Sequence, residues 1–213
     1  MNQSAGGPTL LHAIVAVVLR YPEEDVVRRR GELADLAGTL ARRPSTAALR
    51  RLLGWWTGVA PRALQEAYVE TFDLHKRCSL YLTYYLYGDR RQRGQEFVRL
   101  KRLYEAAGRF LVGRELPDFL PLMLEFAALE PAPGAAILWD SRVGLELLQG
   151  ALHAAASPWA DALDAICLEL PALDDAGREL ARRLAAEGPP GEQVGLEPYG
   201  PPEAMPPSGI ALR

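Results

Sequence analysis

Histidine and cysteine are the side chains in this sequence that could bind a metal or act as nucleophiles. The histidines are His12, His75 and His153, and the cysteines are Cys78 and Cys167. His75 and Cys78 are three residues apart, so on a helix they would share one face. A tight zinc site needs three or four ligands, and no CxxC, HxxxH or HExxH motif supplies the others. We therefore expect no metal site and interpret Cys78 as a packed thiol.

Other catalytic motifs are absent from the sequence. It contains no GxSxG nucleophile elbow, no phosphate loop ending in Gly-Lys-Ser/Thr and no dinucleotide fingerprint after a strand. Cys78 beside His75 could be a nucleophile pair, but no third group that would orient the histidine is evident. His12 lies in the most apolar segment, where we expect a buried, hydrogen-bonded histidine. The sequence therefore predicts a binding protein that is not an enzyme and carries no cofactor.

Apolar residues recur with helical period along most of the chain, which predicts an all-α fold. Residues 78–87 (CSLYLTYYLY) are ambiguous because Tyr and Thr favour strands. Every neighbouring segment has helical period, so we interpret these residues as a buried helix. Proline, glycine and capping residues place a turn at 131–134 and divide the rest into helices. The expected helices are 9–20, 23–40, 45–56, 61–72, 78–87, 91–112, 117–129, 135–155, 159–170 and 174–187.

The composition changes at the C-terminal end of the sequence. Residues 188–213 contain seven Pro and five Gly among 26 residues, which predicts an extended or disordered tail. The organisation expected is a single helical domain over residues 1–187 followed by this tail. The apolar residues of the phrase Val194–Tyr199 could either pin the tail to the domain or present it to a partner.

Length and composition indicate a cytoplasmic protein. The apolar stretch Leu10–Leu19 is too short to span a bilayer, and no basic residue precedes it as in a secretory signal. Only two cysteines occur, so no disulfide framework is implied. The arginine runs at 28–30 and 90–93 could touch nucleic acid, but the net charge of −3 and the lack of a recognition helix argue against it. We expect neither nucleic-acid binding nor stable membrane insertion.

Charge is distributed unevenly along the chain. Residues 1–114 carry 19 Lys and Arg against 11 Asp and Glu, whereas residues 115–213 carry 5 against 16. This asymmetry indicates charged partners, one half of the chain lying against the other, or simply solvated helix faces. A concave acidic surface in the second half would attract a basic peptide.

Two blocks of sequence resemble the family of nitrate reductase assembly chaperones, also called delta subunits. The first comprises Tyr68–Asp73, Arg77–Tyr85 and Gly88–Gly94, and the second is Glu115–Phe126. The phrase 194–199 is also similar to the ends of some members. Two positions depart from the pattern: Phe119 stands where members commonly have His, and Arg90 stands where they have Thr.

The resemblance implies the single-domain helical bundle of the redox-enzyme maturation chaperones. It implies binding to the apo catalytic (alpha) subunit of a respiratory nitrate reductase through that subunit's N-terminal peptide. Molybdenum cofactor and iron–sulfur clusters would be inserted while the subunit is held, and molybdenum cofactor delivery proteins would be further partners. The alternative is a chaperone for another molybdoenzyme, such as a sulfoxide or N-oxide reductase.

The matched blocks also supply candidate partner-binding residues. Asp73 and Arg77 are four apart, so they could either pair on one helix face or contact a partner. The charged cluster that follows Gly88 should lie on an exposed loop suited to recognition, and Asp118 could meet a basic peptide or favour a helix N-terminus. The predicted partner-binding set is Phe72, Asp73, Arg77, Leu82, Tyr85, Asp89, Arg91, Pro117, Asp118, Pro121 and Glu125.

Overall fold

The computed structural model describes residues 6–188, and within them the chain is helical without named strands. The predicted all-α class is therefore confirmed. The proposed tail, including Val194–Tyr199, lies outside the described residues. The helices of the first half are α1 (Gly6–Val18), α2 (Glu24–Arg28), α3 (Arg30–Gly38), α4 (Pro44–Gly58), α5 (Pro61–Tyr68), a π-helical turn (Val69–Asp73), a 3₁₀ turn (Lys76–Cys78) and α6 (Leu82–Tyr87). Those of the second half are α7 (Arg91–Ala106), α8 (Leu120–Leu129), α9 (Pro131–Asp140), α10 (Arg142–Ala154), α11 (Ala160–Cys167) and α12 (Asp175–Glu187).

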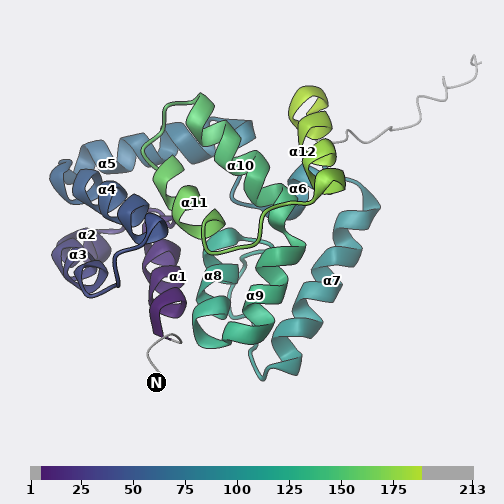
Figure 1. Cartoon of the computed structure of the whole chain (residues 1–213), viewed down its shortest axis with the longest axis horizontal. Coiled ribbons are helices and arrows are strands. Elements are labelled where there is room, and N and C mark those ends of the chain that lie inside the picture. Colours follow the sequence, from purple (N-terminus) through teal and green to yellow (C-terminus); the bar gives the residue numbers. More distant parts are fainter. Residues whose placement is uncertain (1–5, 189–213) are drawn as a thin grey trace, which may run out of the picture.

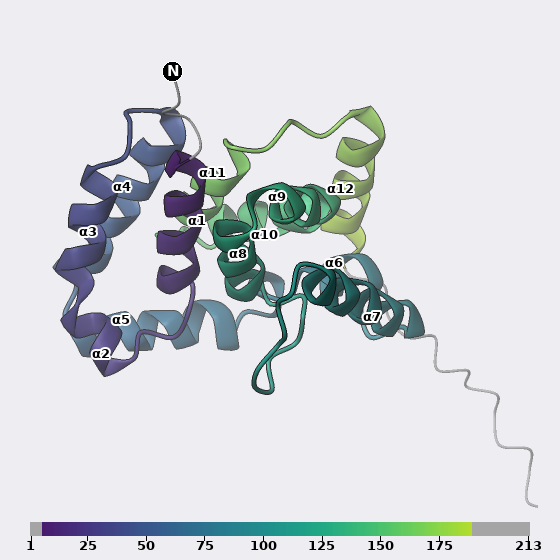
Figure 2. The ribbon, with the colours of Figure 1, turned by 90° about the horizontal axis from the view of Figure 1, so that it is seen from below.

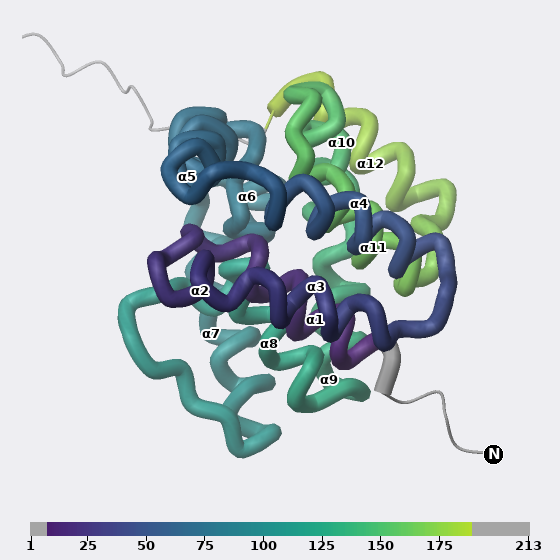
Figure 3. Tube along the Cα trace, turned by 90° about the vertical axis from the view of Figure 1, so that its left-hand side faces the viewer, coloured from purple at the N-terminus to yellow at the C-terminus, as the bar shows by residue number. Residues whose placement is uncertain are grey.

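The core is built where the apolar helices of the two halves meet. α1 is the most apolar segment of the first half and packs against α8, while α4 packs against α11. Figure 1 shows α1 and α8 side by side, and Figure 3 shows α4 lying over α11. Two tryptophans, Trp56 of α4 and Trp159 just before α11, are completely buried in this region. Each half therefore covers the apolar stripe of the other, as a helix with one apolar face requires.

Side chains from distant elements bind the last carbonyls of the α1 segment. The Trp159 indole donates to the Val18 carbonyl at 3.0 Å, and the Tyr68 hydroxyl donates to the Leu19 carbonyl at 3.2 Å. The rings of Tyr68, Phe72 and Trp159 also contact one another in tilted and edge-to-face arrangements, with centroids 4.8 to 5.9 Å apart. Because carbonyls at a helix C-terminus have no partner within the helix, these bonds fix α1 relative to α5 and α11.

Several expected boundaries were wrong. The helix expected over 23–40 is divided at Arg29, and the helix expected from residue 117 begins only at Leu120. Three further differences have a local reason. The helix expected to reach residue 112 ends at Ala106, because Gly108 and Gly113 adopt positive φ angles of 73° and 110°. The turn expected at 131–134 is instead the first turn of α9, where Pro131 takes the first helical position. The helix expected over 135–155 is divided at Ser141 into α9 and α10.

Residues 78–87, which the sequence allowed to be either a strand or a helix, contain an extended part followed by a helical part. Residues 79–81 are extended, Tyr81 forms an isolated antiparallel bridge with Phe119, and a helix begins only at Leu82. The strand-like composition of this segment therefore has a partner, which comes from the second sequence block. The prediction of a helix through all ten residues was wrong at its beginning and right at its end.

α12 occupies a separate position at one end of the molecule. It is joined to α11 by residues 168–174 and packs mainly on α10. Figure 2 shows α12 standing apart from α1 to α5, and it also shows the α7–α8 connection projecting from the body. No helix among the described residues is both long and apolar enough to span a membrane.

Candidate functional site

The largest apolar depression in the described part of the chain lies between α10, α12 and the segment 74–85. It is a groove of about 920 Å³, within the range typical of ligand sites. α10 supplies one wall, α12 the other, and the segment 74–85 the end of the groove. Its apolar lining includes Leu147, Ala151, Ala154, Leu173, Ala181 and Leu184.

The groove is open because α10 carries small residues along the face that looks into it. Gly150 lies in the middle of this helix, and a Cβ added there would have no neighbour within 4 Å. Gly144 lies on a different face of α10. A side chain there would be crowded, because its Cβ would lie 3.0 Å from the Leu82 carbonyl oxygen. α10 is therefore pressed closely onto α6 at one point and leaves open space beside α12 at another.

The two sequence blocks are joined beside this groove. The Leu82 amide donates to the Asp118 carbonyl at 3.1 Å, and the Leu120 amide donates to the Leu80 carbonyl at 2.8 Å. The Asp118 carboxylate accepts from the Thr83 amide at 3.2 Å and from its hydroxyl at 2.5 Å. Asp118 therefore caps the first turn of α6 from a distant segment, in the way that an N-cap side chain normally does from the adjacent residue.

The Asp118 carboxylate is completely buried and is balanced by one cation. The Arg93 guanidinium lies 3.5 Å from it and also donates to the Thr83 hydroxyl at 3.2 Å. Arg93 further contacts the rings of Tyr84 and Phe97. This buried ion pair holds α6, α7 and the segment before α8 together. We refer to the contacts among residues 80–83, 93 and 118–120 as the junction.

The predicted partner-binding residues do not form one surface, and only two of them line the groove. Arg77 and Tyr85 line the groove, and the Tyr85 hydroxyl donates to the Arg77 carbonyl at 2.7 Å. Phe72 belongs to the aromatic cluster around Trp159, and Asp73, Asp89 and Arg91 are exposed away from the groove lining. The others are buried in or near the junction or, for Glu125, paired with Arg20 at 2.9 Å. That last group is Leu82, Pro117, Asp118, Pro121 and Glu125.

Asp73 and Arg77 do not form the ion pair that their spacing allows on a helix. The helix ends as a π-helical turn at Asp73, and the chain then turns through the 3₁₀ segment Lys76–Cys78. No ion pair between the two is found among the described residues, although Arg77 is exposed at the edge of the groove. The break in the helix therefore frees Arg77 for other contacts.

Sequence reasoning missed the two walls of the groove. α10 and α12 contribute most of the lining, and no partner-binding residue was predicted on either. One signal was present: Ala181 and Leu184 form the apolar face of α12, a helix that also carries five charged residues before Leu184, and such a face must cover something.

The charged groups around the groove are mostly cationic. Lys76, Arg77, Arg178 and Arg182 line it, and Glu146 is the one carboxylate among its lining residues. Arg178 and Arg182 already pair with Asp175 and Glu179 on their own helix, at 2.5 and 2.7 Å. The expectation of an acidic concave surface in the second half of the chain was wrong for this groove.

The acidic residues of the second half are largely used inside the molecule. Six ion pairs in the described residues join an arginine of the first half to a carboxylate of the second, with N–O distances from 2.5 to 3.8 Å. These pairs are Arg20–Glu125, Arg43–Glu169, Arg51–Asp161, Arg93–Asp118, Arg99–Asp140 and Arg109–Glu130. Of the explanations considered for the charge asymmetry, the structure supports one half lying against the other.

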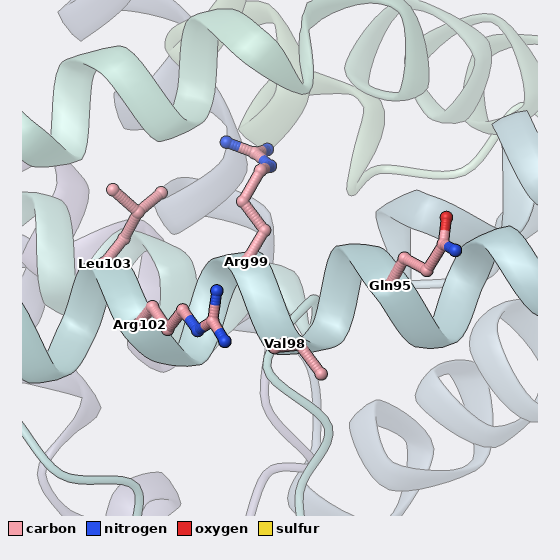
Figure 4. A pocket seen from close by; sticks show the side chains of 5 residues that line it. All are labelled: Gln95, Val98, Arg99, Arg102 and Leu103. Atoms are coloured by element: carbon pink, nitrogen blue, oxygen red, sulfur yellow. The ribbon is translucent and has the colours of Figure 1, made fainter.

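A second depression, on α7, differs from the groove. Figure 4 shows its five side chains, all from one helix, with Arg99 pointing towards the neighbouring helices. The Arg99 guanidinium pairs there with Asp140 at 2.9 Å. A shallow surface on a single helix offers no opposing wall to enclose a ligand, so we do not assign it a binding role.

His75 and Cys78 are not arranged for catalysis or metal binding. Burial raises the pKa of the Cys78 thiol, which keeps it protonated and a weak nucleophile. The His75 Nδ1 atom lies 2.5 Å from the Glu70 carbonyl oxygen. Within residues 6–188 no group of three or more His, Cys, Asp or Glu side chains is placed to hold a metal ion.

Comparison with known proteins identifies the family. The sequence profile of the nitrate reductase delta subunit family matches residues 40–165, which include all residues of the junction and the whole of α10. The chain belongs to this family. The match ends before α12, so one wall of the groove lies inside the family region and the other lies beyond it.

Several curated relatives of this member of the delta subunit family are named as assembly chaperones. Escherichia coli NarJ, a nitrate reductase molybdenum cofactor assembly chaperone, is 36% identical over 120 residues, covering 55% of this chain and 51% of NarJ. A Bacillus subtilis protein also named NarJ is 36% identical over 129 residues, covering 59% of this chain and 68% of that protein. The nitrate reductase-like protein NarX of Mycobacterium tuberculosis is 37% identical over 161 residues, but these are only 23% of its length.

The fold agrees with this family assignment. The crystal structure of a redox enzyme maturation protein from Archaeoglobus fulgidus superposes with a TM-score of 0.60, covering 79% of this chain and 97% of that one, at 21% sequence identity. The delta subunit family is one of assembly chaperones and not of catalytic enzymes.

Proposed function

We propose that this protein is a cytoplasmic chaperone for the apo catalytic subunit of a respiratory nitrate reductase, and that it binds that subunit's N-terminal peptide in the groove between α10 and α12. Bound in this way, the subunit would remain competent to receive molybdenum cofactor and iron–sulfur clusters, with molybdenum cofactor delivery proteins as further partners. The observation that carries the proposal is the open apolar groove in a chain whose relatives are named as nitrate reductase assembly chaperones.

The shape of the groove favours a helical peptide that lays an apolar stripe between two helices. The lining of α10 is small, so a partner backbone can approach closely, while the leucines of α12 offer contact to larger side chains. Affinity in this mode comes mainly from burial of apolar surface, at about 25 cal/mol per Å² removed from water. The cationic side chains at the edge would then select how the peptide is oriented.

Calorimetry with a peptide copying the first residues of the catalytic subunit tests this function. We expect binding to the wild-type chain, and loss of at least about tenfold in affinity for Ala154→Arg, because Ala154 is an exposed groove residue and arginine would fill the space beside it. The matched control is Ala136→Arg, an exposed helical alanine of α9 outside the groove lining, which should bind as the wild type does.

Two outcomes would contradict the proposal. One is equal loss of affinity in both variants, which would place the peptide elsewhere. The other is equal affinity for the leader peptide of an N-oxide or sulfoxide reductase, which would favour the alternative client. In cells, deletion of the gene should leave nitrate reductase polypeptides made but lacking molybdenum and activity, and Ala154→Arg should reproduce that defect while Ala136→Arg should not.

A further inference from the structure

The groove is wider than the contacts of the described chain require. Glycine in the interior of an exposed helix costs about 0.5–1 kcal/mol relative to alanine. Gly150 has no packing neighbour that would justify this cost, unlike Gly134 and Gly144, whose Cβ atoms would meet neighbouring residues. The apolar atoms of Leu147, Ala151 and Leu184 also face this space. The groove therefore has room for a further apolar segment.

The last described residue lies at the edge of the same groove. Gly188 lines it and adopts a φ angle of 81°, a conformation that side-chain-bearing residues rarely take and that turns the chain at the end of α12. Twenty-five residues follow Gly188 in the sequence. Val194 is six residues further on, a reach of up to roughly 20 Å for an extended chain. The segment 189–213 is thus attached at the edge of the groove and is long enough to enter it.

The composition of that segment complements the groove. Val194, Leu196 and Tyr199 provide apolar side chains for its lining. Residues 189–213 contain three Glu and one Arg, whereas the groove presents Lys76 and Arg77; the α12 arginines of the lining pair with carboxylates of their own helix, and Glu146 pairs with Arg142. Opposite charges favour and orient such an encounter. Attachment also gives the segment an effective concentration on the order of millimolar, so even a weak contact would be populated.

We propose that residues 194–199 occupy the groove between α10 and α12 and compete there with the client peptide. This chain's own tail would shield the apolar lining until a client displaces it. The competition rests on the proposed function, because it assumes that the client uses the same groove; the docking of the tail does not. If the tail occupies the groove in about nine molecules of ten, the apparent affinity for a client falls about tenfold.

Hydrogen–deuterium exchange of the full-length chain tests the docking without any client. In the wild type, amides of residues 194–199 should exchange about tenfold more slowly than in an unstructured peptide of the same sequence. The double variant Leu196→Asp/Tyr199→Asp should lose this protection, and exchange should accelerate in the groove segments 150–155 and 181–188. Ala204→Asp/Ser208→Asp adds the same charge to the tail outside 194–199 and should behave as the wild type does.

The groove variant Ala154→Arg supplies the reciprocal test. It should free residues 194–199 to exchange at the unprotected rate although the tail itself is unchanged. Wild-type amides at 194–199 that already exchange at the unprotected rate would overturn the proposal, and so would protection that survives Ala154→Arg.

Client binding then separates the two proposals. The variant Leu196→Asp/Tyr199→Asp should bind the client peptide about tenfold more tightly than the wild type. A wild-type tail that is protected, in a protein that binds no client peptide with or without the tail substitutions, would support docking of the tail and overturn the proposed function. Client binding by a wild-type protein whose tail is unprotected would support the proposed function and overturn the docking of the tail.

Discussion

The junction and the groove lie next to each other and are built on opposite principles. At the junction, the Thr83 amide, the Thr83 hydroxyl and the Arg93 guanidinium all face Oδ2 of the completely buried Asp118 carboxylate, while its Oδ1 has no hydrogen-bond partner among the described residues. In the groove, apolar side chains and an unpacked glycine face open space. Every residue of the junction belongs to the blocks that carry the family resemblance, whereas α10 and α12, which supply most of the groove lining, lie outside those blocks. Sequence similarity here marks the structure that positions the site more than the binding surface itself.

This difference separates stability from recognition. Substitutions in the junction should unfold or loosen the protein, whereas substitutions in the groove should leave the fold intact and change what binds. The proposed partner-binding residues of the junction, Leu82 and Asp118, would then affect a client only through the position of α6 and α8. Those of the groove, Arg77 and Tyr85, would affect it directly.

The largest effect is expected for Asp118→Ala. The substitution removes the acceptor of the Thr83 amide and hydroxyl and the buried carboxylate that faces Arg93, so the free energy of unfolding should fall by about 3–5 kcal/mol. Asp89 also pairs with Arg93, at 3.4 Å, but is exposed, so Asp89→Ala is the matched control and should change stability little. Urea denaturation measures both. Equal losses in the two variants would show that the junction is no more rigid than the surface.

Alanine substitutions at two glycines should have smaller effects on the free energy of unfolding, and the two effects should have opposite signs. A Cβ at Gly134 would lie 2.2 Å from the Ala127 Cα atom, so Gly134→Ala should destabilise the α8–α9 contact by about 1–3 kcal/mol. Gly150→Ala meets open space and should stabilise the protein by about 0.5–1 kcal/mol. Thermal unfolding reads out both. Destabilisation by Gly150→Ala would mean that the groove is closed in solution.

The buried side chain of His12 should make the stability of the fold depend on pH. It was expected to be hydrogen-bonded, but neither ring nitrogen has a partner among the described residues, and burial lowers its pKa. Glu169, which pairs with Arg43 and Ser45, opposes that shift. Because the folded pKa lies below the unfolded value of 6.5, the stability that neutral His12 contributes is present above pH 6.5 and is lost as pH falls below it.

Urea midpoints between pH 7.5 and 5.5 test this sign. The wild type should lose stability over that interval, and His12→Leu should lose less. His153, which pairs with Asp164 at an exposed site, provides the control variant His153→Gln, which should follow the wild type. An identical decline in all three proteins would exclude His12 as its source.

The smallest effect concerns salt. An acidic groove would bind a basic peptide less tightly as ionic strength rises, but the edge of this groove is mostly cationic. We expect the affinity of a basic client peptide to stay constant or to rise slightly between 50 and 300 mM salt, which is roughly a twofold change in screening length. Calorimetry at the two concentrations measures it, and a marked fall in affinity would place the peptide on another surface.

The sequence predicts the helices better than their connections. The proline start of α4, the Asp174 cap of α12 and the apolar faces of α1 and α10 follow from local rules, and each is observed. The extended residues 79–81 and the remote cap of α6 could not be predicted, because their partner lies 35 residues away in the chain. The groove could not be predicted either, since it arises from how α12 is placed beside α10.

The remote cap has a consequence for the order in which the chain folds. α6 has only six residues, and a helix this short is not stable alone in water. Its first turn is held by Asp118, so α6 must remain unformed during synthesis until residues 118–120 have left the ribosome and α7 has folded back. The side of the groove that contains Tyr84 and Tyr85 is therefore completed late, after the helices of the first half can already pack on one another.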